Sequence, residues 1–293
     1  MCGARRLRCV RDETHPGPRS AAAPSASGDT RPTTAARPTV GSALPGAAAL
    51  RWEIACLLAL SLGASAVSAV ISFAGVLTAP ESLAEHTASL VRPQADRRPW
   101  LDLSWQLYRV AVGLAPVLLA GYLLHRSAES MRTIGFDLRR PWFDLRSGAV
   151  LAALIGTGGL AVYVVSWQLG MTVTIAPSAL EGNWWDVPVL VLQAAKNGIL
   201  EEVIVVGYLL HRLGQLGWAP WKAVAAASVL RALYHLYQGV GMFFGNLVMG
   251  LVFGWFYHRY GRVMPLAVAH TVIDIAAFVG SVYLLDRLSW LPS

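Results

Sequence analysis

Charged residues are scarce in this 293-residue sequence. Asp, Glu, Lys and Arg make up 14% of it, whereas a soluble domain carries about 25%. The deficit is concentrated in long apolar runs, and none of these runs alternates apolar and polar residues as membrane β-strands do. Every backbone polar group in hydrocarbon must be satisfied internally. The sequence therefore excludes a soluble globular protein and favours a bundle of membrane-spanning helices.

Metal-binding and disulfide patterns are missing as well. The three cysteines, Cys2, Cys9 and Cys56, have the spacing of neither a zinc site nor a disulfide framework. No H-E-x-x-H pattern occurs. A zinc site built from histidines and acids is an open alternative, but the sequence favours a protein without metal or other cofactor.

Seven apolar runs are long enough to cross ~30 Å of hydrocarbon at ~1.5 Å per residue. The two runs nearest residue 240 are separated by only four residues, so they must form a tight helical hairpin, with Gly245, Gly250 and Gly254 as packing positions. The predicted fold class is all-α, a polytopic transmembrane bundle of about seven helices. The predicted helices span residues 52–78, 103–124, 147–168, 187–210, 221–237, 242–257 and 263–285.

The basic residues predict an orientation. With the N-terminus inside, 17 of the 24 Lys and Arg residues fall in cytoplasmic segments and four in outside segments. This asymmetry is what the positive-inside rule predicts for an N-in, C-out protein. The net charge of +7 is therefore explained by membrane orientation and contact with anionic lipid. We expect no nucleic-acid partner. We expect a multi-pass protein of the cell membrane, the bacterial inner membrane in particular.

Composition divides the chain at about residue 50. Residues 1–50 are rich in Ala, Pro, Ser, Thr and Arg, and such a segment predicts a disordered, basic cytoplasmic tail. A start codon assigned too early in the gene would explain the tail equally well. Residues 51–293 form the predicted membrane domain, with supporting helices over 51–170 and a catalytic core over 186–285.

Ionisable residues inside the predicted helices of the second half indicate a polar site. An ionisable group at mid-membrane costs ~2.5–3.5 kcal/mol on insertion scales, so each one must face a partner or water. Asn197 and Glu201, Arg231 and His235, and His270 and Asp274 are each separated by four residues, which places each pair on one helix face. The ionisable residues are Lys196, Glu201, Glu202, Arg231, His235, His270 and Asp274.

The residue types point to hydrolysis. A buried Glu can take a proton from water with a neighbouring His to share it, and a second His can donate to a developing oxyanion. No Ser or Cys lies among the clustered positions, so the pattern favours attack by water on an amide.

The order of these residues resembles the CAAX protease and bacteriocin-processing family (CPBP, or Abi) of intramembrane glutamate endopeptidases. The matching features are the double glutamate Glu201-Glu202, then His235, then the run His270-Thr271-Val272-Ile273-Asp274. The resemblance covers about residues 95–285. It implies a membrane-associated peptide or protein substrate and no required metal. It also implies Glu201 as the catalytic base, His235 as its partner on water, His270 and Asp274 as oxyanion stabilisers and Glu202 as a supporting carboxylate.

The chain departs from the family pattern at three positions. The motif arginine is Val206, the motif aromatic before the histidine is Arg231, and the third motif ends in Asp274. We hypothesise that Arg231 supplies the buried cation that the family places at position 206. We further hypothesise that Asp274 keeps His270 protonated, which strengthens His270 as a hydrogen-bond donor.

Other functions remain open at this point. The missing motif arginine is compatible with a proteolytically inactive family member that acts as a scaffold or immunity factor. A proton-coupled transporter would also use buried Glu, His and Arg, although the chain shows no inverted repeat. Glu201 and Glu202 could instead form a purely structural ion pair with Lys196 or Arg231.

Overall fold

The computed structural model describes residues 45–78, 83–89, 98–176 and 183–284, together with Pro80, Val91, Gln94 and Ala95. The predicted tail lies outside the described residues up to position 44, and a helix already begins at Ala47. The described residues are mainly helical. The exceptions include two three-residue strands, β1 (Thr87–Ser89) and β2 (Thr174–Ala176), which pair in parallel. The predicted all-α class is confirmed for the described residues, although these two short strands were not predicted.

The helices lie along the predicted apolar runs, but the runs 52–78, 103–124 and 187–210 are each divided into two or more elements. In chain order they are α1 (Ala47–Ala59), α2 (Leu62–Leu77), α3 (Pro99–Gly113), α4 (Ala115–Arg126), α5 (Pro141–Gln168), α6 (Asp186–Glu201), α7 (Leu209–Gln215), α8 (Pro220–Tyr234), α9 (Val240–Tyr260) and α10 (Met264–Leu284). Two 3-10 turns, Leu83–Glu85 and Leu236–Gln238, and a π-helical segment, Glu202–Tyr208, complete the order.

Three helical stretches of the described chain are long and apolar enough to cross a membrane. They are Pro99–Arg126, which joins α3 and α4, Pro141–Gln168 and Val240–Tyr260. A fourth span results if α1 and α2, which meet at a bend of 51°, are counted as one broken helix. The structure therefore supports a helical membrane protein, while the count of about seven spans and the N-in, C-out orientation stay predictions.

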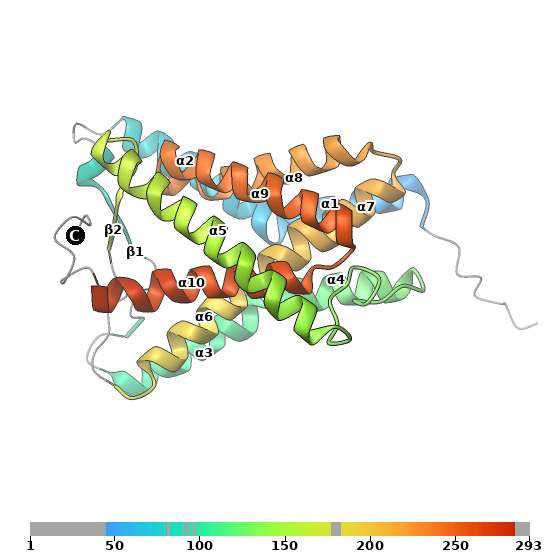
Figure 1. Ribbon diagram of the computed structural model, residues 1–293, viewed down its shortest axis with the longest axis horizontal. Coiled ribbons are helices and arrows are strands. Elements are labelled where there is room, and N and C mark those ends of the chain that lie inside the picture. Colours follow the sequence, from blue (N-terminus) through green and yellow to red (C-terminus); the bar gives the residue numbers. More distant parts are fainter. Residues whose placement is uncertain are drawn as a thin grey trace, which may run out of the picture. The chain divides into compact units, whose positions relative to one another are not determined.

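Neighbouring helices of the membrane domain pack in the order α3, α6, α10, α5, α9, α8 and α2 (Figure 1). In this order α10 lies between α5 and α6, and the hairpin α8–α9 packs between α5 and α2. The C-terminal half of the chain thus supplies the centre of the bundle. Helices α6, α8 and α10, which carry the predicted site, meet at the π-helical segment that continues α6.

The π-helical segment Glu202–Tyr208 interrupts the predicted fourth helix, 187–210, near its C-terminal end. All seven of its residues are buried, four of them in the β-branched run Val203–Val206. β-Branched side chains lower α-helical propensity because they lose rotamer freedom against the preceding turn. Short π-helical segments inside α-helices occur frequently at functional sites. This one begins directly after Glu201.

Two buried arginines outside the predicted site tie the bundle together. Arg212 is fully buried and binds Glu129 at 2.8 Å and Glu53 of α1 at 3.5 Å. Arg262, in the turn between α9 and α10, binds Asp144 of α5 at 2.6 Å and Asp137 at 3.1 Å. Burial alone would raise the pKa of Asp137, but the Arg139 backbone N–H and the Arg262 guanidinium lower it overall. Both arginines join helices that are distant in sequence.

The helix hairpin α8–α9 depends on close contact at glycine. A Cβ atom on Gly250 would lie 2.9 Å from the Cα atom of Ser228 on α8, whereas one on Gly245 would meet only the Val162 side chain, at 3.5 Å. We therefore expect Gly250→Ala to lower the stability by about 1–3 kcal/mol through overpacking, with little change in Gly245→Ala. Thermal unfolding in detergent checks this, and equal midpoints for the two variants would contradict the tight hairpin.

Candidate active site

All seven predicted site residues form one connected network. Glu201 ends α6 and Glu202 begins the π-helical segment, Arg231 lies on α8 with His235 directly after that helix, and α10 supplies the last two, His270 and Asp274. Asn197 of α6 binds Asp274, which faces His270; His270 binds Glu202, and Glu202 binds Arg231. The Arg231 carbonyl group holds His235, and the guanidinium lies near Glu201. The structure thus brings together residues from three helices and the π-helical segment.

Glu202 is at the centre of this network. Its Oε1 atom accepts from Arg231 Nη2 at 2.6 Å and from His270 Nδ1 at 2.7 Å, and the side chain is fully buried. A buried carboxylate without a cation would carry a penalty of several kcal/mol, and here two cationic or donor groups offset it. The sequence predicted a supporting role for Glu202, and in the structure it contacts two site residues directly.

Arg231 lies where it must lie if it replaces the buried cation that the family pattern places at position 206. It is fully buried, its Nη2 atom is 2.6 Å from Glu202 and its Nη1 atom is 3.8 Å from Glu201. The guanidinium carbon also lies 5.6 Å from the centre of the Phe253 ring, in a cation–π contact. Val206, in contrast, is part of the apolar core, with 2% of its surface exposed. The cation of the site therefore comes from α8.

Glu201 differs from Glu202 in its surroundings. Its side chain keeps 11% of its surface exposed, and its Oε2 atom faces Arg231 Nη1 at 3.8 Å and His270 Nε2 at 4.0 Å. The same oxygen accepts a hydrogen bond from the Tyr234 hydroxyl at 2.7 Å. Within the described part of the chain, Oε1 has no hydrogen-bond donor. One carboxylate oxygen is therefore held by the protein and the other is open to a small molecule such as water.

His235 is oriented by the backbone of α8, the helix that ends just before it. Its Nδ1 atom lies 3.1 Å from the Arg231 carbonyl oxygen, and because a carbonyl oxygen can only accept, Nδ1 carries the proton. In the neutral imidazole, Nε2 is then the accepting atom. The half-buried His235 can therefore accept a proton or a hydrogen bond from water at Nε2.

His270 has a closer partner than the sequence predicted. We expected Asp274 to hold it protonated, but Asp274 Oδ1 is 3.6 Å from Nε2, whereas Glu202 Oε1 is 2.7 Å from Nδ1. Asp274 is fixed from its other side by Asn197 Nδ2, which donates to Oδ2 at 3.2 Å. Glu202 is therefore the main partner of His270, and Asp274 is a second, weaker one.

Lys196, the alternative ion-pair partner for the glutamates, packs against Gly113 of α3. Its stem crosses Gly113, where a Cβ atom would be 2.6 Å from Lys196 Cδ. No carboxylate of the described residues lies within 4 Å of its ammonium group. The glutamates are thus paired by Arg231 and not by Lys196.

Sequence reasoning missed Tyr234. Its side chain is 5% exposed, its hydroxyl binds Glu201, and its ring centre lies 4.7 Å from that of His235. A buried tyrosine hydroxyl needs a hydrogen-bond partner, and Tyr234 follows Arg231 by three residues, which is one helix turn. The three-residue spacing from Arg231 was the feature of the sequence that could have identified Tyr234 as a site residue.

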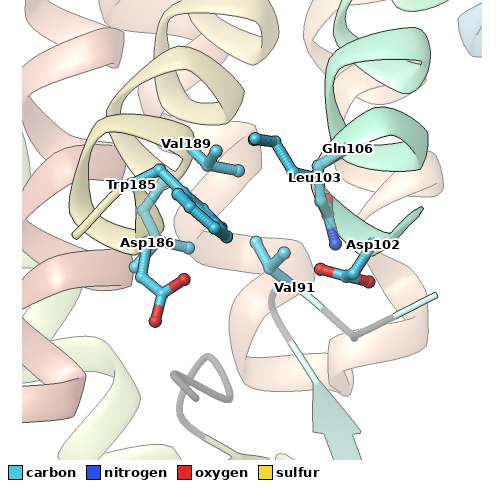
Figure 2. Close-up of a pocket in the computed structure, with 8 residues that line it drawn as sticks. Val91, Asp102, Leu103, Gln106, Trp185, Asp186 and Val189 are labelled. Carbon is cyan, nitrogen blue, oxygen red and sulfur yellow. The ribbon is translucent and has the colours of Figure 1, made fainter. Parts of the chain in front are cut away.

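Two pockets of the described residues lie away from this network. A pocket of about 30 Å³ lies between the N-terminal ends of α3 and α6 (Figure 2), and a volume of this size holds about one water molecule. A hollow of about 600 Å³ lies over the segment from α4 to Leu138. Neither contains a predicted site residue. The small pocket is lined by Val91, Asp102, Leu103, Gln106, Trp185, Asp186, Val189 and Leu190.

The His, Asp and Glu side chains of the network form hydrogen bonds with one another and with Asn197 and Arg231. Among the described side chains, no group of three or more His, Cys, Asp or Glu residues has the geometry of a metal site. The open alternative of a zinc site therefore has no support from the arrangement of these residues.

The comparisons with known proteins point to the same part of the chain. Residues 183–276 match the family model for type II CAAX prenyl endopeptidases, described as Rce1-like. No characterised protein and no solved structure matches the chain. The matched stretch contains all seven predicted site residues, the π-helical segment and Tyr234. Residues 183–276 are therefore similar to the Rce1-like family, and the predicted resemblance to the CAAX protease and bacteriocin-processing family is confirmed over this stretch.

Proposed function

We propose that this protein is an intramembrane endopeptidase that hydrolyses a peptide bond of a membrane-associated substrate. The single observation that carries the proposal is the joining of Glu201, Glu202, Arg231 and His270 by contacts of 4.0 Å or less. Buried charges are normally retained in membrane helices for function. The Rce1-like match over the same residues supports peptide hydrolysis over other uses of such a cluster.

In the proposed reaction, water is the nucleophile. Glu201 takes a proton from the water molecule, which His235 Nε2 also contacts, and the water oxygen forms a bond to the peptide carbonyl carbon. His270 donates to the resulting oxyanion, with Asp274 beside it. The carbon–nitrogen bond then breaks, and the proton moves from Glu201 to the leaving amine. No metal is required by this scheme.

The position of Arg231 argues against an inactive scaffold or immunity factor. That alternative rested on the loss of the motif arginine at Val206, but a guanidinium 2.6 Å from Glu202 supplies the same charge from α8. A proton-coupled transporter is less well supported, because the sequence shows no inverted repeat. We propose a multi-pass location in the cell membrane, the bacterial inner membrane in particular.

The test uses purified protein in liposomes and a library of membrane-anchored peptides that includes prenylated CAAX peptides, with products identified by mass spectrometry. We expect cleavage by the wild type in the presence of a chelator and its loss in Glu201→Gln. Glutamine can still accept from Tyr234 but cannot take a proton from water. The matched control is Glu53→Gln, which alters a glutamate that accepts from Tyr208 at 3.1 Å outside the site.

A folded wild type that cleaves no peptide, or a Glu201→Gln variant that cleaves at the wild-type rate, would contradict the proposed function. Loss of cleavage on addition of the chelator would contradict the metal-independent scheme. Loss of cleavage in Glu53→Gln as well would show that the assay reports general damage to the bundle.

A further inference from the structure

Tyr234 contacts both residues of the proposed water-activating pair. Its hydroxyl donates to Glu201 Oε2 at 2.7 Å, and its ring lies 4.7 Å from the His235 ring, tilted by 42°. The residue that precedes His235 in the chain therefore reaches across to the end of α6. Helix α8 fixes the positions of both contacts, because Tyr234 is its last residue.

The hydrogen bond makes the two oxygens of Glu201 different. Arg231 Nη1 at 3.8 Å and His270 Nε2 at 4.0 Å also face Oε2, so three positive or donor groups of the described chain converge on that one atom. Oε1 is left without a donor among the same residues. A carboxylate held at one oxygen keeps a single orientation, and its other oxygen can act as a base with fixed geometry.

We propose that Tyr234 is a positioning residue that holds Glu201 by Oε2 and directs Oε1 at the water molecule. The inference rests on the proposed function and adds a residue to it. Tyr234 is 5% exposed, so it acts through Glu201 and His235 and leaves substrate binding to other residues. Removal of its hydroxyl therefore affects the chemical step and not the affinity for the peptide.

The chain contains a second tyrosine–glutamate pair for comparison. Tyr208, 1% exposed, donates to Glu53 at 3.1 Å, and this pair lies beside Arg212, outside the site. Tyr208→Phe removes a hydroxyl from an equally buried tyrosine with the same kind of partner. Comparison of Tyr208→Phe with Tyr234→Phe therefore separates a positioning role in catalysis from the general effect of removing a buried, hydrogen-bonded hydroxyl.

The experiment measures kcat and KM for a peptide that the wild type cleaves, in the Tyr234→Phe and Tyr208→Phe variants. We expect Tyr234→Phe to lower kcat about 10- to 100-fold, the range for loss of a hydrogen bond to a charged group, with KM unchanged. Tyr208→Phe is expected to keep the wild-type kcat. Tyr234→Leu, which removes the ring that contacts His235, is expected to lower kcat further.

A second measurement does not depend on activity. The infrared carboxylate band of Glu201 is identified as the band that Glu201→Gln removes, and we expect it to shift in Tyr234→Phe and not in Tyr208→Phe. Wild-type kcat in Tyr234→Phe, an unshifted band, or equal losses of kcat in the two Tyr→Phe variants would each overturn the role of Tyr234 and leave the proposed function standing. A wild type that cleaves nothing would overturn the proposed function, and the catalytic role of Tyr234 with it.

Discussion

An Arg231→Ala variant is expected to lose peptide cleavage and to unfold at a markedly lower temperature than the wild type. Arg231 is fully buried and provides the cation for Glu202 at 2.6 Å and for Glu201 at 3.8 Å. Removal of one partner from a buried ion pair costs about 3–5 kcal/mol, because the other charge stays buried without compensation. Here two carboxylates lose their cation at once. The expected measurements are the thermal midpoint in detergent and the rate of peptide cleavage.

Val206→Arg in the Arg231→Ala background is the decisive second variant. Val206 follows Glu202 by four residues in the π-helical segment, and the family pattern places its arginine there. We expect partial recovery of cleavage and stability. Recovery stays incomplete because Val206 is 2% exposed, and the larger side chain costs about 1–3 kcal/mol in overpacking.

The matched control is Arg212→Ala. Arg212 is equally buried and pairs with Glu129 and Glu53, so its loss is expected to destabilise the protein to a similar extent. Val206→Arg should not rescue it. Full cleavage by Arg231→Ala, or equal rescue of both arginine variants by Val206→Arg, would contradict the compensation between positions 206 and 231.

The helix positions were predictable because long apolar runs have few other solutions in hydrocarbon. The prediction for 242–257, for example, lies within α9 at Val240–Tyr260. The predicted single helix over 52–78 was wrong, since α1 and α2 are separated at Leu60 and Ser61 and bent by 51°. Ser61 donates to the Leu57 carbonyl at 2.6 Å, and serine bonds of this kind often bend helices. The prediction for this stretch used apolar content alone, which carries no information about such a bend.

The candidate site was predictable within each helix and not between helices. Four-residue spacing correctly placed Arg231 near His235 and His270 near Asp274. It could not identify Glu202 as the closest partner of His270, because that contact depends on how α10 is rotated against the π-helical segment. The same limit hid the bond from Tyr234 to Glu201. Side-chain spacing describes one helix face, while partners across helices are set by packing.

A Glu202→Gln variant is expected to fold with reduced stability and to cleave peptide about 10²- to 10³-fold more slowly. Its Oε1 atom binds both Arg231 and His270. Glutamine keeps one accepting oxygen but carries no charge, so Arg231 loses most of its compensation and His270 loses the partner that orients it. Misplacement of one oxyanion donor reduces kcat by about 10²–10³. KM should change little, since Glu202 is fully buried and cannot contact the peptide.

Glu202→Asp and Glu53→Gln separate charge from position in this prediction. Aspartate keeps the charge but is one methylene shorter, so it can compensate Arg231 while it reaches His270 less well; we expect its stability near the wild type and its kcat clearly lower. Glu53→Gln weakens a carboxylate that faces the buried Arg212 at 3.5 Å and should lower stability without loss of cleavage. Thermal midpoints and steady-state kinetics of the three variants check this. If Glu202→Gln cleaved at the wild-type rate, His270 would not depend on Glu202, and Asp274 at 3.6 Å would have to be its functional partner.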